Sequence, residues 1–215
     1  MRLPSAREVR RLRAPLPEPQ ALAWDGNALW LSSRVTHDVY RFDAAAASAQ
    51  ETHRAPGTPN GITYDGRALR VLCGEGAEDD RYVRRFVTGA GFESDRIPCP
   101  ELTGSYLAWD GTTLFVTQWY RQRVLALDAD GNVQRDIAAP RQLCGCTFVD
   151  GDLFLMTTED EETDEYFLMR VRFDRAQPSF EDVARVPLKA RSLAWDGQTF
   201  WTNHRERHEI VAFEA

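Results

Sequence analysis

Five Asp-Gly pairs recur along the chain, and the residues at a fixed offset from them are the first candidates for binding chemistry. Their aspartates are Asp25, Asp65, Asp110, Asp150 and Asp196. The residues five positions before these aspartates are Gln20, Asn60, Ser105, Gly145 and Arg191. Four of the five are polar, so their amide, hydroxyl and guanidinium groups would hold a polar ligand if the fold brought them together. The alternative is that they only cap loops at the starts of strands.

A second group of candidates follows the apolar run after each Asp-Gly pair. Trp119 lies outside the repeat, between Gln118 and Tyr120. Loops at one end of a repeated scaffold are free to carry function because they are not needed for packing. We predict one ligand-binding set of seven residues: Gln20, Asn60, Gln118, Trp119, Arg191, Asn203 and His204. The ligand would be a small polar molecule or the end of a peptide.

Cys144 and Cys146 are the candidates for a metal site. Residues two apart on a strand point to the same face, so these thiolates and a partner would supply soft ligands. The alternative is that both are buried thiols. His204 and His208 are four apart, which aligns two ligands only on a helix, and this segment is expected in a hairpin. We therefore predict no metal and no cofactor.

Carboxylates are the candidates for a general base. Glu101 lies four residues before Ser105, and Glu75 stands in a long acidic connection. A second acidic connection holds Glu159, Asp160, Glu161, Glu162, Asp164 and Glu165. Such runs bind a cation or a basic partner, or else they are solvated loop tips. No Gly-rich phosphate loop, nucleophile elbow or zinc-peptidase helix is present, so the sequence leaves catalysis open.

The elements that must position these residues come from one unit repeated five times. The aspartates are separated by 40, 45, 40 and 46 residues, a period typical of propellers and solenoids. Each Asp-Gly pair joins two short apolar runs, which indicates a β-hairpin because glycine adopts positive φ without steric cost. A third run rich in β-branched and aromatic residues follows, and a fourth leads to the next copy. Four strands per copy match one blade of a β-propeller.

The two ends of the chain complete each other. The last copy ends after its third run, whereas residues 8–15 resemble a fourth strand with nothing before it. We therefore predict that the N-terminal strand completes the last blade and leaves no open edge. The fold class is all-β, a five-bladed β-propeller with four antiparallel strands per blade, forming a single domain over residues 1–215. The expected blades lie near residues 21–55, 61–98, 106–138, 146–187 and 192–215 together with 8–15.

The tryptophans keep the same register as the repeat. Trp24, Trp109 and Trp195 precede Asp-Gly pairs, whereas Trp30 and Trp201 share a position in the following strand. We interpret all five as packing between neighbouring blades, because aromatic side chains contribute most of the contact area in such cores.

Composition excludes some classes of partner. The net charge is −7, which argues against nucleic acid because a phosphate backbone needs a basic surface. No apolar stretch approaches the roughly 18 residues needed to cross a membrane, and the start lacks the apolar run of a signal peptide. Four cysteines are too few for a disulfide-stapled domain of this size. We predict a cytoplasmic protein that does not bind a membrane; its oligomeric state stays open.

Three segments resemble the repeats of the glutamine cyclotransferase group, the plant and bacterial glutaminyl cyclases. They cover residues 20–26, 60–66 and 114–119. The resemblance implies a five-bladed propeller that cyclises an N-terminal glutamine, which needs a carboxylate, hydrogen-bond donors and an aromatic wall near the channel mouth. In that family a Glu or Gln before Gly at the start of the first strand of a blade belongs to this apparatus. Gln20 and Asn60 match these positions as amides, and the nearest carboxylate is Glu101.

Three functions are consistent with these residues. The leading hypothesis is a propeller that binds a small polar molecule or a peptide end at a polar channel mouth. The second is a non-catalytic scaffold whose protein partner contacts the acidic connections. The third is a cyclase-like or lyase-like enzyme with Glu101 or Glu75 as its base.

Overall fold

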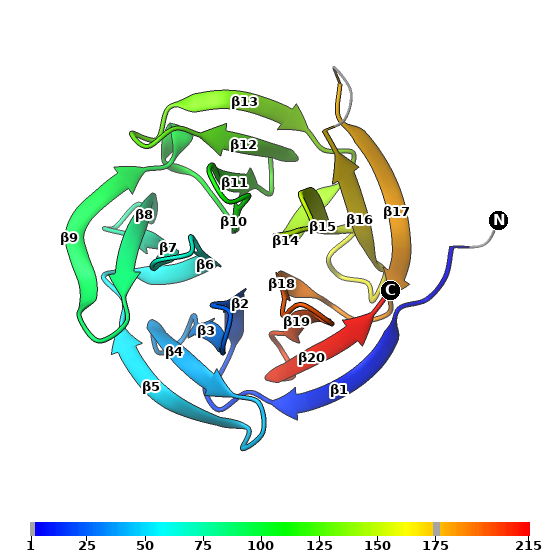
Figure 1. Cartoon of the computed structure of the whole chain (residues 1–215), viewed down its shortest axis with the longest axis horizontal. Helices are drawn as coiled ribbons and strands as arrows, with labels where there is room; N and C mark the ends of the chain where they lie inside the picture. The colour runs from blue at the N-terminus through cyan, green and yellow to red at the C-terminus, as the bar shows by residue number, and fades with distance from the viewer. Residues whose placement is uncertain (1–2, 174–176) are drawn as a thin grey trace.

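The computed structural model describes residues 3–173 and 177–215, and it contains five four-stranded antiparallel sheets arranged around one axis (Figure 1). Each sheet is a blade of a β-propeller, so the predicted five-bladed fold is confirmed. Blade 1 consists of β2 (Pro19–Trp24), β3 (Leu29–Ser33), β4 (Asp38–Asp43) and β5 (Ser48–Arg54). Blade 2 consists of β6 (Thr58–Tyr64), β7 (Leu69–Glu75), β8 (Asp80–Val87) and β9 (Gly91–Pro98).

The other three blades repeat this order. Blade 3 consists of β10 (Leu107–Trp109), β11 (Leu114–Gln118), β12 (Arg123–Leu127) and β13 (Val133–Ala138). Blade 4 consists of β14 (Gln142–Val149), β15 (Asp152–Thr158), β16 (Tyr166–Arg172) and β17 (Ser179–Val186). Blade 5 consists of β18 (Arg191–Trp195), β19 (Phe200–His204), β20 (Glu209–Glu214) and β1 (Arg7–Arg13). The first strand in each of these lists faces the axis, and the last lies at the rim (Figure 1).

The N-terminal strand closes the ring, as predicted. β1 pairs with β20 in antiparallel register from Arg7 opposite Glu214 to Arg13 opposite Glu209. The residues before β1 reach the neighbouring blade, because Arg185 of β17 exchanges backbone hydrogen bonds with Pro4 and Ala6 at 2.8 and 2.7 Å. The N-terminal and C-terminal strands therefore pair within blade 5, and the residues before β1 also contact blade 4.

The hydrophobic core lies between blades rather than within them. Trp30 of blade 1 packs edge-on against Phe86 of blade 2, with ring centroids 5.4 Å apart, in a cluster that also holds Val71. Trp201 of blade 5 packs with Leu31 and Tyr40 of blade 1. These contacts confirm that the tryptophans of the repeat pack between blades. Because each cluster needs two blades, no blade buries its apolar face alone.

Four of the five innermost strands, β2, β6, β14 and β18, have a β-bulge near their first residues. Pairing shifts register between Pro59 and Gly61 in β6 and between Leu143 and Gly145 in β14, with similar shifts in β2 and β18. A bulge adds one residue to one strand and turns its side chain away from the normal alternation. These bulges lie near the starts of the strands, and therefore at one end of the central axis.

Helical structure is minimal in residues 3–173 and 177–215. The one helix there is the three-residue 3₁₀ turn η1 (Pro100–Leu102), between β9 and β10. No helix in these ranges is long and apolar enough to cross a membrane.

Candidate functional site

A pocket of about 200 Å³ opens at the end of the axis where the innermost strands begin. We call it the mouth. Residues from all five blades line it, and they are Gln20, Arg34, Asn60, Arg81, Thr103, Gly104, Ser105, Tyr106, Trp119, Tyr120, Glu161, Arg191 and Arg205. Four of the seven predicted ligand-binding residues are among them, namely Gln20, Asn60, Trp119 and Arg191.

One ring of the mouth comes from residues at or just before the starts of the innermost strands. Strand register places Gln20, Asn60, Ser105 and Arg191 at the same repeat position. In blade 4 that position belongs to Cys144, not to Gly145 as counting back from Asp150 predicts. The count slips by one because Val149 pairs directly with Asp152 across a two-residue turn, whereas the other hairpins use four residues.

A second ring comes from the residues that directly follow the second strands. Arg34, Trp119 and Arg205 follow β3, β11 and β19 at the same repeat position. The corresponding residue in blade 2 is Gly74, and a Cβ built there would overlap Oδ1 of Asp79 at 1.7 Å and would lie 3.0 Å from Nη1 of Arg81. The missing side chain thus leaves room for Asp79 and for its ion-pair partner Arg81, which lines the mouth from β8.

The two amides are held in place by the backbone and by an arginine. Gln20 and Asn60 are only 4% and 6% exposed. Nε2 of Gln20 donates to the carbonyl of Asn60 at 3.2 Å, while its Oε1 accepts from Arg205. Nδ2 of Asn60 donates to the Thr58 carbonyl at 2.8 Å. Fixed amides of this kind preorganise a polar surface for a ligand.

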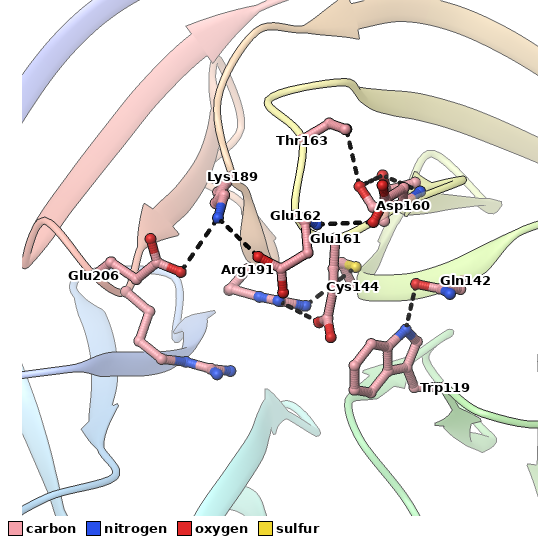
Figure 2. Close-up of polar contacts among 12 residues, drawn as sticks. Trp119, Gln142, Cys144, Asp160, Glu161, Glu162, Thr163, Lys189, Arg191 and Glu206 are labelled. Carbon is pink, nitrogen blue, oxygen red and sulfur yellow. Dashed lines mark hydrogen bonds and ion pairs between the residues drawn. The ribbon is translucent and has the colours of Figure 1, made fainter.

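Arg191 connects three features of the mouth (Figure 2). One of its Nη atoms donates to the carboxylate of Glu161 at 2.7 Å, and the other donates to Sγ of Cys144 at 3.5 Å. Its guanidinium carbon lies 5.6 Å from the ring centroid of Trp119. Glu161 comes from the acidic connection between β15 and β16, so this connection contacts the mouth.

Trp119 forms an aromatic wall whose orientation is fixed. Its Nε1 donates to Oε1 of Gln142 at 3.1 Å, and its backbone N–H donates to Oγ of Ser105 at 3.2 Å. Tyr120 packs against it with the rings tilted by 31° and their centroids 4.6 Å apart, and Tyr120 is 88% exposed. A planar or apolar part of a ligand would rest against this wall.

Tyr106 is a lining residue that we did not predict. The other blades place small residues at its repeat position: Ala21, Gly61, Gly145 and Ser192. Burial raises the pKa of the Tyr106 phenol, and the nearby charges of Arg191 and Arg205 act in the opposite direction. A single large residue at a position that is otherwise small was the signal available in the sequence. The arginines of the second ring and Glu161 were likewise not selected.

Gln118, Asn203 and His204 do not line the mouth. Nε2 of Gln118 donates to the carbonyls of Pro100 and Thr103, both at 3.0 Å, so Gln118 supports the segment that enters β10. His204 is buried in β19, where burial lowers its pKa, and its Nδ1 accepts from the backbone of Arg207. Asn203 is also buried, and its side-chain amide has no hydrogen-bond partner among the described residues.

The two candidate bases lie outside the mouth in ion pairs. Glu75 accepts from Arg84 through both oxygens at 2.8 Å and from Arg96 at 2.7 Å, and these contacts lower its pKa. Glu101 pairs with Arg121 and Arg123, and its pKa is lowered by the hydrogen bond from Arg123. A carboxylate whose anion is stabilised in this way is a weaker base.

The two candidate thiols face different inter-blade clusters. Cys144 packs between blades 4 and 5, and Cys146 packs between blades 3 and 4. Our expectation that both point the same way was wrong, because the bulge between Leu143 and Gly145 breaks the alternation. Burial raises the pKa of Cys144 to about 11 and raises that of Cys146 further. Among the described residues, no cluster of His, Cys, Asp or Glu is arranged to hold a metal ion.

Solved structures share this architecture. The chain resembles glutaminyl cyclase from Myxococcus xanthus with a TM-score of 0.74 at 11% identity, covering 98% of this chain and 96% of that one. The fold is shared with a glutaminyl cyclase. The fold resemblance expected from the repeat segments is therefore confirmed.

Two other similar structures have different roles. One is a PQQ-bound aldose sugar dehydrogenase from Streptomyces coelicolor, with a TM-score of 0.62 at 14% identity over 98% of both chains. The other is a chain of a mitotic checkpoint complex, with a TM-score of 0.53 at 13% identity over 89% of this chain and 62% of that one. No protein-family model matches the sequence, and no curated protein matches it. Since one architecture serves such different roles, function must be argued from the mouth.

Proposed function

We propose that the protein binds a small polar molecule or the end of a peptide at the mouth. The observation that carries this proposal is the convergence of fixed polar groups and one aromatic wall on a single pocket. Small-molecule sites combine an apolar surface with a few oriented polar groups, and the mouth has both. A cytoplasmic location stays a prediction; the four cysteines are free and buried, which suits a reducing compartment.

Trp119 and Asn60 provide the test of this function. We would titrate the protein with the free amino acids and with the dipeptides Gln-Ala and Ala-Gln, and follow thermal shift and tryptophan fluorescence. The substitutions Trp119→Ala and Asn60→Ala should each weaken the apparent affinity for the ligand at least about tenfold, since each removes a lining contact. The ligand-induced thermal shift should shrink accordingly. Gln198→Ala is the control, because Gln198 is exposed in the hairpin at the opposite end of blade 5. Equal shifts in wild type and both mouth variants would refute the pocket.

Cyclisation of N-terminal glutamine stays an alternative, because the fold is shared with a glutaminyl cyclase and the mouth contains one carboxylate, Glu161. Incubation with Gln-Ala and detection of pyroglutamate would decide it. A rate equal to the spontaneous one in wild type, together with measurable binding, would assign the mouth a binding role without this reaction.

A protein-interaction scaffold is the other alternative. The acidic connection that it would present contains Glu161 and Glu162, which pair with Arg191 and Lys189 of the same chain (Figure 2). Glu159→Gln, Asp160→Asn and Glu162→Gln together remove charges of this connection that do not line the mouth, and the variant should keep small-molecule binding within about twofold. A loss of binding in that variant would favour a role for the whole connection.

A further inference from the structure

The mouth carries more positive charge than its own carboxylates neutralise. Its lining holds Arg34, Arg81, Arg191 and Arg205 but one carboxylate, that of Glu161. This concentration of one sign is unusual in a chain whose net charge is −7. Arginines that gather in a concave site attract anions from solution, because the surrounding low-dielectric walls strengthen their field.

Ion pairing accounts for two of the four arginines. Arg191 pairs with Glu161 at 2.7 Å. Arg81 pairs with Asp79 at 2.6 Å, although the Asp79 side chain is 53% exposed and the pair is therefore screened by solvent. Among the described residues, neither Arg34 nor Arg205 has a carboxylate within 4.0 Å. The guanidinium of Arg205 instead donates to the neutral amide oxygen of Gln20.

Two buried N–H groups of these arginines lack an acceptor. Within residues 3–173 and 177–215, Nε of Arg205 and Nη1 of Arg81 are buried without a hydrogen-bond partner. A buried donor without a partner is costly, and more so when it is charged. Burial also lowers the pKa of both guanidiniums, and the charge of Arg34 lowers them further. An anion placed between the arginines would offset the mutual repulsion of their charges and the cost of burying them.

We propose that the mouth selects a small organic oxyanion, whose carboxylate or phosphoryl group is held by Arg205 and Arg81 with Arg34 at the rim. This inference deepens the proposed binding function and rests on it. Guanidinium groups match both kinds of oxyanion through paired hydrogen bonds. The volume of about 200 Å³ limits the ligand to a small molecule, and the wall formed by Trp119 would contact its uncharged part.

Glu161 acts as an internal competitor in this scheme. Its carboxylate already occupies the fourth arginine, and it enters the mouth from the connection between β15 and β16. Removing its charge with Glu161→Gln frees Arg191 and makes the lining more positive. This variant should therefore bind an oxyanion more tightly than the wild type does.

The test compares ligands that differ in charge but hardly in shape. Benzoate, phenyl phosphate, succinate and inorganic phosphate are titrated calorimetrically at low salt, with benzamide and succinamide as the neutral partners. At least one organic oxyanion should bind about tenfold or more tightly than its neutral partner. The substitution Arg205→Gln should weaken that oxyanion roughly 10- to 100-fold and leave benzamide unchanged. Benzoate against phenyl phosphate separates the carboxylate from the phosphoryl group.

Arg172→Gln is the matched control, because Arg172 is paired with Glu181 at 3.5 Å at the outer side of blade 4. Equal affinity for charged and neutral partners would overturn the oxyanion inference and leave the binding function intact. Absence of binding by every probe, charged or neutral, up to about 10 mM would overturn both. An Arg172→Gln variant that loses as much affinity as Arg205→Gln would also overturn the inference, since the effect would then be one of overall charge.

A second measurement needs no arginine variant to fold. Iodide and acrylamide quench exposed tryptophan, and only iodide is charged. The fluorescence of Trp119 is the part that the substitution Trp119→Phe removes. For this part and for the remaining tryptophans, we compare the ratio of the iodide quenching constant to the acrylamide quenching constant. If the mouth concentrates anions, this ratio should be at least about twofold higher for Trp119. A ratio equal to that of the remaining tryptophans would overturn the inference.

Discussion

The aspartate of an Asp-Gly pair holds both its own turn and the next strand. Oδ1 of Asp196 accepts from the backbone N–H groups of Gln198 and Thr199 at 2.8 and 2.7 Å. Its other oxygen accepts from Nε1 of Trp201 at 2.7 Å. Asp25 and Trp30 make the same pair in blade 1, also at 2.7 Å. The recurrence of Asp and Trp five residues apart thus has a hydrogen bond behind it, in addition to packing between blades.

Replacing this aspartate tests both contacts at residue scale. Asp196→Ala should lower the free energy of unfolding by about 2–3 kcal/mol, because it leaves the Trp201 indole and two backbone donors without an acceptor. Asp110→Ala is the control, because Asp110 bonds only its own turn and Phe115 stands where the other blades have Trp. It should cost about 1–2 kcal/mol. Chemical denaturation measures both, and equal costs would contradict a role for the indole bond.

Glu75 makes the residue-scale prediction for pH. Its folded pKa is lowered, first by the hydrogen bond from Arg84, so its stabilising contribution is complete above the unfolded pKa and disappears as pH falls through the folded value. Glu75→Gln should cost about 2–3 kcal/mol near pH 7, because the carboxylate is only 12% exposed and two arginines lose their partner. The cost should shrink as pH falls below about 4.5. A cost that stays constant from pH 7 to pH 3 would contradict the ion-pair explanation.

At the scale of the element, the innermost strands are limited by how closely they approach at the axis. A Cβ at Gly145 of β14 would overlap the backbone of Ser192 and Leu193 in β18. A Cβ at Gly61 of β6 would come within 2.8 Å of the Cα of Tyr106. Close approach of the backbones therefore keeps this position small in β6 and β14, whereas in blade 3 it holds Tyr106.

Gly145→Ala should therefore destabilise the contact between β14 and β18. We expect a loss of about 3 kcal/mol in the free energy of unfolding, because the added methyl group meets backbone atoms that cannot rotate away. Ala21→Gly, at the same repeat position in blade 1, removes a methyl group instead and should cost about 1 kcal/mol. Thermal and urea denaturation compare them. A neutral Gly145→Ala would show that the strands can separate without penalty.

At the scale of the whole molecule, stability depends on the ring being closed. β1 covers the edge of β20, and its residue Leu12 and the following Ala14 pack into the cluster between blades 5 and 1. Ala6 packs against the cluster between blades 4 and 5. The N-terminal segment therefore protects one strand edge and parts of two clusters, and each cluster connects two blades.

Deleting residues 1–14 should open the ring. We expect the melting temperature to fall by about 10 °C or more and the unfolded protein to aggregate, because an exposed strand edge and apolar surface are created together. Deletion of residues 1–3 is the control, since it leaves β1 and the contacts of Pro4 and Ala6 with Arg185 in place. Calorimetry and light scattering would measure both, and a deletion of residues 1–14 that melts like the full chain would disprove the role of closure.

The fold was predictable because its signals are local and repeated. Each Asp-Gly pair specifies a turn by positive φ at glycine, and the missing fourth strand at one end matches the extra strand at the other. The mouth was predictable in part, since repeat position selects Gln20, Asn60 and Arg191, whereas Trp119 was selected as an aromatic residue outside the repeat. The choice of Gly145 instead of Cys144 failed because one shorter turn shifts the register by a residue.

The amino-acid sequence by itself determined the number of blades, their closure and which tryptophans pack between them, because these follow from spacing along the chain. Only the tertiary structure decided which side chains meet at the mouth. Bulges turn individual residues toward the axis, the space left by Gly74 admits the paired side chains of Asp79 and Arg81, and Glu161 reaches Arg191 from another connection. Such contacts join residues that are far apart in sequence, so they depend on the direction of each side chain in three dimensions and on no repeated local signal.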